Sequence, residues 1–154
     1  LGQSLYLREI CGRESGAPPP VDLALEKKNG EFVRELIRDG VASAVHDVSD
    51  GGLLVALAEM AMASKVGAKL EAPAGVAAHG FWFGEDQGRY IITVDEAKVA
   101  AINANASKTG VSLLRLGATG GDALTLTGER PILVSMLNER FEGWLPRYMA
   151  GGAA

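Results

Sequence analysis

Residues 45–54 constrain the fold of this chain more than any other ten-residue segment. Their sequence, VHDVSDGGLL, begins in a short apolar run (42–46) that predicts a strand and ends in a longer run (53–64) that predicts a helix. That helix is apolar nearly all round, with Glu59 as its one charge, so we expect it to be buried. The chain must therefore turn from a strand directly into a buried helix within residues 47–52.

The turn is also a candidate anion site. Ser49 or Asp50 can cap the helix, while Gly51 and Gly52 leave backbone N–H groups open at its positive end, where an anion or phosphate is stabilised. The alternative is an ordinary capped turn between a strand and a helix, built from the same residues. Physical chemistry alone favours that alternative.

A second polar cluster lies at residues 84–89, between two apolar runs. Glu85, Asp86, Gln87 and Arg89 supply two carboxylates, an amide and a guanidinium, a set that can bind a polyhydroxylated or phosphorylated ligand. Arg89 would be the bidentate phosphate donor. The alternative is a solvated hairpin loop, which the spacing alone favours because most polar loops bind nothing.

The remaining pattern mixes helices and strands without strict alternation. Predicted helices cover 1–11, 29–40 with Asn29 as N-cap, 53–64, 95–110 with Asp95 as N-cap, and a final stretch around 137–148. Predicted strands cover 42–46, 67–71, 81–83, 89–94, 111–116, 123–127 and 132–134, with 72–80 as a loop and 119–122 as a β-turn. This order predicts an α+β fold with a mixed sheet flanked by helices.

The sequence pattern also predicts how several individual residues pack. The final helix carries Leu137, Phe141, Trp144, Leu145 and Tyr148 on one stripe. Pro146 should kink or end its regular part. We expect Trp82 and Trp144 to anchor the core, Cys11 to be a packed thiol, and disorder to be confined to 151–154.

Composition excludes several classes of function. The 154 residues carry 15 Lys and Arg against 19 Asp and Glu, with no basic stripe, so nucleic acid is not an expected partner. The longest apolar stretch, 53–63, is too short to span a membrane. One Cys and two distant His residues form no metal-binding spacing. His46 beside Asp47 suggests an acid/base pair, but neighbours on a strand point to opposite faces, which favours a packing histidine.

Three motifs together carry a resemblance that covers essentially the whole chain. They are LYLREI at 5–10 with the connector APPPVDL at 17–23, HDVSDGG at 46–52, and FGEDQGRY at 83–90, with WLP at 144–146 fitting as well. This combination resembles the C-terminal domain of the phosphoribosylformylglycinamidine synthase family of purine biosynthesis. The Asp-Gly-Gly turn alone is shared with the aminoimidazole ribonucleotide and selenophosphate synthetase families, which remain alternatives.

The resemblance implies an α+β domain like the C-terminal domain of aminoimidazole ribonucleotide synthetase. It also implies a cytoplasmic ligase that uses ATP, Mg²⁺ and glutamine-derived ammonia to convert formylglycinamide ribonucleotide into the amidine. In that family the metal ligands and the catalytic histidine lie in N-terminal-type domains. We therefore expect no catalytic residue and no metal ligand in this chain, an isolated chain without activity, and no tight binding of ATP or Mg²⁺.

The family's synthetase chain is internally duplicated, with one catalytic half and one half that holds a structural nucleotide. A Glu-Ser-Gln motif contacts the substrate in the first half, and this chain has Asp86 in place of Ser. The added negative charge suits a substrate phosphate poorly, so the resemblance implies the second, non-catalytic half. The alternative is an assembly module that holds the structural nucleotide and docks glutaminase partners.

The resemblance also implies a place in a longer enzyme. The chain starts at Leu1 without a methionine, and we expect residues 1–154 to be one domain, with 1–20 as a helix and Pro-rich connector leading into it. The expected partners are the other domains of the same chain, a glutaminase subunit and a small accessory subunit. If Ala154 lies near the natural end, the parent is the small form, which receives ammonia from separate chains.

Overall fold

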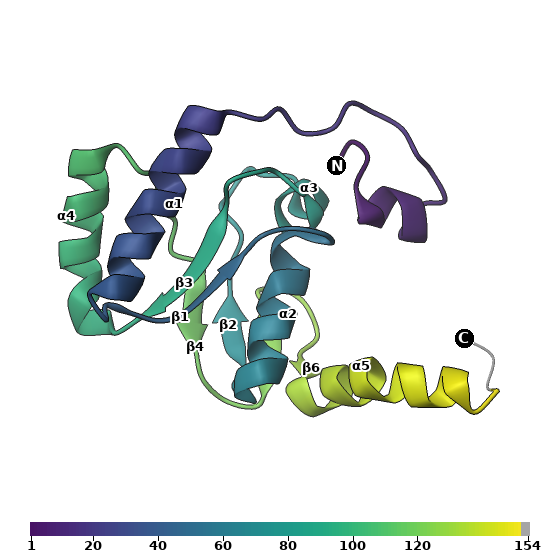
Figure 1. Cartoon of the computed structure of the whole chain (residues 1–154). Coiled ribbons are helices and arrows are strands. Elements are labelled where there is room, and N and C mark those ends of the chain that lie inside the picture. The colour runs from purple at the N-terminus through teal and green to yellow at the C-terminus, as the bar shows by residue number, and fades with distance from the viewer. Residues whose placement is uncertain (152–154) are drawn as a thin grey trace. The chain divides into compact units, whose positions relative to one another are not determined.

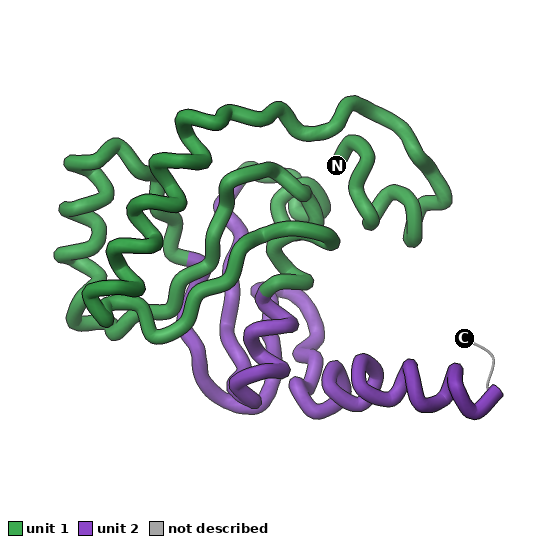
Figure 2. Tube along the Cα trace, in the orientation of Figure 1, with its two compact units in different colours: residues 1–56, 75–115 green, residues 57–74, 116–154 purple. Residues whose placement is uncertain are grey.

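The computed structural model describes residues 1–151, which divide into two compact units (Figure 2). Unit 1 combines residues 1–56 with 75–115, and unit 2 combines 57–74 with the chain from 116 onward. A single domain over 1–154 stays a prediction. The expected disorder at 151–154 falls, apart from Gly151, outside the described residues.

Unit 1 is built on a two-stranded antiparallel ribbon (Figure 1). Strand β1 (Ala42–Asp47) pairs with β3 (Tyr90–Val94), so that His46 lies opposite Ile91. Its other elements are η1 (Tyr6–Ile10), α1 (Leu23–Arg38), the start of α2 (Gly52–Ser64), α3 (Ala78–Phe83), η2 (Glu96–Lys98) and α4 (Val99–Thr109). Helices α1 and α4 lie side by side and bury a core of Phe32, Leu36, Ile102 and Ala106, with Ile92 and Val94 of β3 packed against it. The predicted strand 42–46 and helix 53–64 are confirmed to within one residue.

The N-cap of helix α1 lies seven residues earlier than predicted. The carboxylate of Asp22 accepts hydrogen bonds from the backbone N–H groups of Ala24 and Leu25, which makes Asp22 the N-cap. Asn29 lies inside the helix and donates its amide to the carbonyl of Gly88 at 3.0 Å. The prediction of Asn29 as N-cap was wrong because the polar residues of 24–31 form a solvent-facing first half of the helix and not a boundary.

Helix α3 replaces the predicted strand at 81–83. As a helix, the aromatic run buries Trp82, which is 6% exposed, and stacks Phe83 on Tyr6 with ring centroids 4.6 Å apart. Three aromatic residues in a row carry no period that separates strand from helix. The predicted loop 72–80 consequently ends at Ala77. Residues 84–89 therefore lead from a helix into β3, and they are not the hairpin loop between two strands that spacing favoured.

The helix expected at 95–110 is confirmed as η2 followed by α4. The side chain of Asp95 accepts from Ala97 N–H, and Gly110 ends α4 in the left-handed conformation at φ +69°. The first predicted helix, 1–11, is reduced to the single turn η1, and Cys11 behind it is exposed. The packed thiol was thus a wrong prediction, because one short turn has no face that can bury it.

Unit 2 holds a four-stranded mixed sheet in the order β4-β2-β5-β6. Strands β2 (Ala68–Leu70) and β5 (Ala123–Leu126) are parallel, while β4 (Gly117–Thr119) and β6 (Ile132–Leu133) each run antiparallel to their neighbour. Together with the helices, this confirms the α+β class with a mixed sheet. Because β2 lies between β4 and β5, residues 119–122 cross over a strand and do not close a hairpin.

The predicted strand at 111–116 was misplaced and lies at 117–119 instead. The N–H of Val111 is taken by the carbonyl of Ala106 at the end of α4, which removes it from any strand pairing. Gly117 marks the true strand, since a Cβ there would lie 1.8 Å from the carbonyl oxygen of Lys69. Only glycine allows β4 and β2 to approach so closely.

Helix α5 (Val134–Met149) closes unit 2 and carries Pro146 inside it, so Pro146 does not end the helix. Trp144 is 50% exposed, and the prediction that it anchors the core was wrong. Val134 is the buried residue of this helix, and Phe141, Trp144, Leu145 and Tyr148 are 50–64% exposed. Among the described residues, no helix is both long and apolar enough to cross a membrane.

Candidate functional site

The carboxylate of Glu85 forms hydrogen bonds to two segments that are distant in the sequence. Its Oε1 accepts hydrogen bonds from the backbone N–H of Leu5 at 2.8 Å and of Gly51 at 2.9 Å. The two donors belong to the N-terminal segment and to the turn before α2, 80 and 34 residues away from Glu85. A charged acceptor forms stronger bonds than a neutral one, so this carboxylate joins three distant segments. We call this arrangement the Glu85 clasp.

The backbone of the turn explains why glycine stands at the clasp. Gly51 and Gly52 adopt φ values of +80° and +76°, which L-residues with side chains rarely tolerate. A Cβ on Gly52 would also lie 2.7 Å from the carbonyl carbon of Phe83 and from the carbonyl oxygen of Gly84. The turn is therefore pressed against the end of α3, which brings Gly51 N–H within reach of Glu85.

Both N–H groups that the sequence offered to an anion are engaged within the chain. Gly51 donates to Glu85, and Gly52 donates to the carbonyl of Ser49 at 3.0 Å. The side chains of Ser49 and Asp50 are exposed. The turn does hold a negative group at the start of α2, and in this structure that group is the chain's own carboxylate. Binding of an external anion by Ser49, Asp50, Gly51 and Gly52 stays a prediction.

The other polar side chains of the 84–89 cluster bind to groups within the cluster itself. The guanidinium of Arg89 donates to the carbonyl oxygens of Gly84 and Asp86 and lies 3.3 Å from the Asp86 carboxylate. Gln87 donates its amide to the carbonyl of Glu85 at 3.5 Å. The structure thus brings all four predicted residues together. Arg89 holds the loop itself in shape, Glu85 binds the segments of Leu5 and Gly51, and Asp86 and Gln87 are exposed.

The N-terminal segment is held onto this site by packing as well as by the clasp. Tyr6 stacks on Phe83 at 27° and lies 5.6 Å from the ring of His79. Ser4 is only 2% exposed, and Gln3 ties the segment into a ring through hydrogen bonds to Ser15 and Gly16. Sequence reasoning missed the pairing of Leu5 N–H with Glu85 because a backbone donor carries no sequence signal. The one available signal was the joint resemblance of the three motifs.

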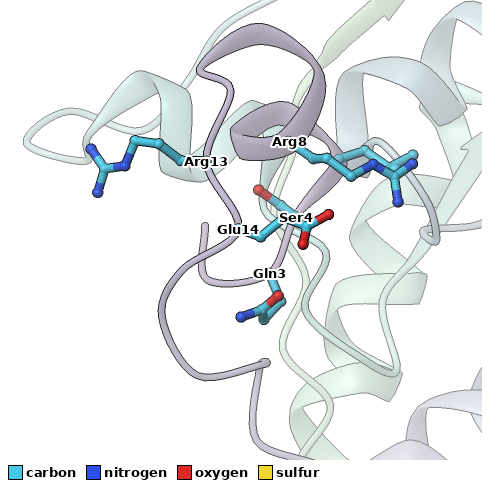
Figure 3. A pocket seen from close by; sticks show the side chains of 6 residues that line it. Gln3, Ser4, Arg8, Arg13 and Glu14 are labelled. Atoms are coloured by element: carbon cyan, nitrogen blue, oxygen red, sulfur yellow. The ribbon is translucent and has the colours of Figure 1, made fainter.

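A small hollow lies beside η1 (Figure 3). Its volume is about 60 Å³, and it is lined by Gln3, Ser4, Leu5, Arg8, Arg13 and Glu14. Arg8 and Arg13 point away from each other, and Arg8 pairs with Glu9 at 2.7 Å. The hydrogen bond and charge of Glu9 raise the pKa of Arg8, and Glu14 and Asp50 add to the effect. Ligand pockets usually measure about 300–1,000 Å³, so this hollow suits a few waters better than a nucleotide.

His46 and the acidic residues do not assemble a metal centre. The Nδ1 of His46 lies 2.6 Å from the carbonyl oxygen of Asp47 and 3.7 Å from its carboxylate. Neighbours on a strand were expected to diverge, but the imidazole folds back along the chain toward Asp47. Within residues 1–151, no three His, Cys, Asp or Glu side chains gather closely enough to hold a metal ion.

The chain is similar to known proteins over nearly its whole length. Residues 1–133 match the family described as AIR synthase related protein, C-terminal domain. The phosphoribosylformylglycinamidine synthase subunit PurL of Methylocella silvestris is 67% identical over 150 residues, which is 97% of this chain and 20% of the relative. The corresponding subunit of Bradyrhizobium diazoefficiens is 57% identical over all of this chain and 21% of its own length. The chain therefore spans about a fifth of the relatives it matches.

Solved structures with the same fold come from Thermotoga maritima. The structure of PurLQS has a TM-score of 0.69 at 16% identity, covering 89% of this chain and 24% of that one. PurL complexed with FGAR has a TM-score of 0.63 at 18% identity (73% and 21% covered), and PurL complexed with ATP 0.67 at 16% (89% and 24%). At these identities the likeness shows the fold.

Proposed function

The chain belongs to the family of AIR synthase related protein C-terminal domains, and on that basis we propose that it is one domain of a phosphoribosylformylglycinamidine synthase. The observation that carries the proposal is the 67% identity to a PurL subunit over 97% of the chain. The complete enzyme would convert formylglycinamide ribonucleotide, ATP and glutamine-derived ammonia into formylglycinamidine ribonucleotide. It would act in the cytoplasm and use Mg²⁺.

Within that enzyme, we propose that this domain belongs to the non-catalytic half. Within residues 1–151, no three His, Cys, Asp or Glu side chains gather closely enough to hold a metal ion, and the hollow beside η1 has a volume of only about 60 Å³. We therefore assign no step of the reaction to this chain. Glu85 and Arg89, the strongest ligand candidates, are engaged in holding the domain together, and their role is positional.

The second candidate function is that of an assembly module. Its basis is the similar T. maritima structure named PurLQS. Under this proposal the domain docks a glutaminase subunit and a small accessory subunit, and it supports a structural nucleotide held by neighbouring domains. A role in the related aminoimidazole ribonucleotide or selenophosphate synthetases is less well supported, because the high identities point to PurL.

An activity test with matched variants separates these roles. In the full-length enzyme, Asp86→Asn and Gln87→Ala change exposed side chains outside the Glu85 clasp. A domain in the non-catalytic half predicts kcat/KM within about two-fold of wild type for both, with ATP, ammonia and formylglycinamide ribonucleotide as substrates. A loss of ten-fold or more without loss of stability would instead place these residues against substrate.

Assembly is tested with the same variants by measuring the Kd for the glutaminase subunit. A weakened complex with unchanged ammonia-dependent activity would favour the assembly module. The isolated 154-residue chain is assayed beside the full-length enzyme, and we expect it to show no synthase turnover. Failure of the full-length chain to make formylglycinamidine ribonucleotide from any nitrogen source would overturn the proposed enzyme.

A further inference from the structure

Helix α5 exposes an apolar stripe along its whole length. We define the α5 stripe as Leu137, Phe141, Trp144, Leu145 and Tyr148. At 100° per residue these positions fall within an arc of about 100°. Phe141, Trp144, Leu145 and Tyr148 are 50–64% exposed, although such side chains normally supply the core. Figure 1 shows α5 extending away from the strands of its own unit.

Two aromatic residues of the stripe contact each other. The rings of Trp144 and Tyr148 are stacked, with centroids 5.3 Å apart and planes inclined by 8°. Large aromatic side chains dominate the binding energy of protein interfaces. An exposed apolar patch of this composition is typical of an interaction surface.

The extent of the family match shows that α5 is not part of the common domain. The family model ends at residue 133, and α5 begins at Val134. The PurL relatives nevertheless match 97–100% of the chain, including this region. The region of α5 is therefore shared with the PurL relatives. Those relatives are about five times as long as this chain.

The charges along the edges of the stripe argue against a second copy as its partner. Arg140 and Arg147 follow one edge, and Glu142 lies beyond the other. Antiparallel pairing of two α5 helices would set the arginine edges against each other, because like edges meet in that arrangement. In a parallel pair, identical positions face each other, so each bulky ring of Phe141, Trp144 and Tyr148 would meet the same ring of the second copy. An unlike surface with carboxylates facing Arg140 and Arg147 fits better.

We propose that the α5 stripe packs against another domain of the same synthase polypeptide. The inference rests on the proposed function, since that function supplies the longer chain. The partner surface is apolar, is buried by Phe141, Trp144 and Tyr148, and carries acidic groups beside the two arginines. Helix α5 thus serves as an interdomain strut that attaches this domain to the rest of the enzyme.

Hydrogen exchange on two forms of the protein tests the proposal. Amides of residues 138–149 should exchange about ten-fold or more slowly in the full-length chain than in the 154-residue chain, because packing suppresses local opening of the helix. In the full-length chain, Phe141→Glu should remove that protection while leaving the amides of β2 and β5 unchanged. Glu139→Lys is the matched control, since Glu139 is exposed and lies about 170° around α5 from the centre of the stripe.

Three outcomes would overturn the proposal. Equal exchange of α5 in both forms means that nothing in the longer chain covers it. Protection that grows with concentration in the 154-residue chain identifies a second copy as the partner, and protection that requires an added glutaminase subunit identifies a partner subunit. Exchange is measured without substrate, so loss of the proposed activity with α5 protection intact would count against the proposed function alone.

Discussion

Helices α1 and α5 have the same length and a similar amphipathic pattern, but only α1 buries several residues of its apolar face. Each contains 16 residues. Helix α1 buries Phe32, Val33 and Leu36 against the ribbon of unit 1, whereas α5 buries Val134 alone. An apolar stripe thus shows which face of a helix seeks a partner, and it does not show whether the partner lies within the same chain segment. The following predictions test that difference.

The largest expected effect comes from matched phenylalanines. Phe32→Ala should lower the free energy of unfolding by about 3–5 kcal/mol, because Phe32 is 4% exposed and its removal leaves a cavity. Phe141→Ala in the same 154-residue chain should change it by less than about 0.5 kcal/mol. Urea unfolding followed by circular dichroism measures both. A similar loss for the two variants would contradict the contrast between α1 and α5.

The Glu85 clasp provides the next contrast, between a carboxylate inside unit 1 and one on its surface. Glu85→Ala should cost about 1–3 kcal/mol, because the N–H groups of Leu5 and Gly51 lose their acceptor. Hydrogen exchange at those two amides should rise sharply. Asp86→Asn is the control and should leave both amides protected. Unchanged protection in Glu85→Ala would show that packing of Tyr6 alone holds the N-terminal segment.

A smaller effect concerns how the two helices begin. The Asp22 carboxylate caps α1, whereas Leu133 before α5 offers no side-chain cap. Asp22→Ala should therefore cost about 1 kcal/mol and increase exchange in the first turn of α1. Asp22→Asn, which keeps a capping oxygen, should recover most of that loss. If both variants are equally destabilised, the negative charge matters more than the hydrogen bonds.

The two tryptophans allow the same comparison without any change in stability. Trp82 is 6% exposed and Trp144 is 50% exposed. Acrylamide should quench Trp144 strongly and Trp82 weakly, so Trp144→Phe should remove most of the quenchable emission of the 154-residue chain. In the full-length enzyme the emission lost with Trp144→Phe should be shielded from acrylamide. Equal quenching of the Trp144 emission in both forms would contradict the proposed burial of α5.

Local chemistry explains which elements were predictable. The strand and helix around residues 45–54, the Asp95 cap and the Gly110 stop depend on residues close in sequence, and the structure confirms them. The helix at 81–83 and the early start of α1 were missed, because aromatic runs and polar first turns have no decisive period. The polar cluster 84–89 was recognised by composition, but its engagement depends on donors 34 and 80 residues away.

The sequence by itself determined the α+β class, the turn at 47–52 and the membership of a synthetase family, since these rest on local patterns and on motifs read together. Only the tertiary structure decided that Glu85 holds the turn from inside, and that the stripe of α5 remains uncovered. The physical reason is that burial and hydrogen-bond partnership are properties of segments distant in the chain. A helical stripe or a carboxylate records the need for a partner, and the fold alone determines which partner is within reach.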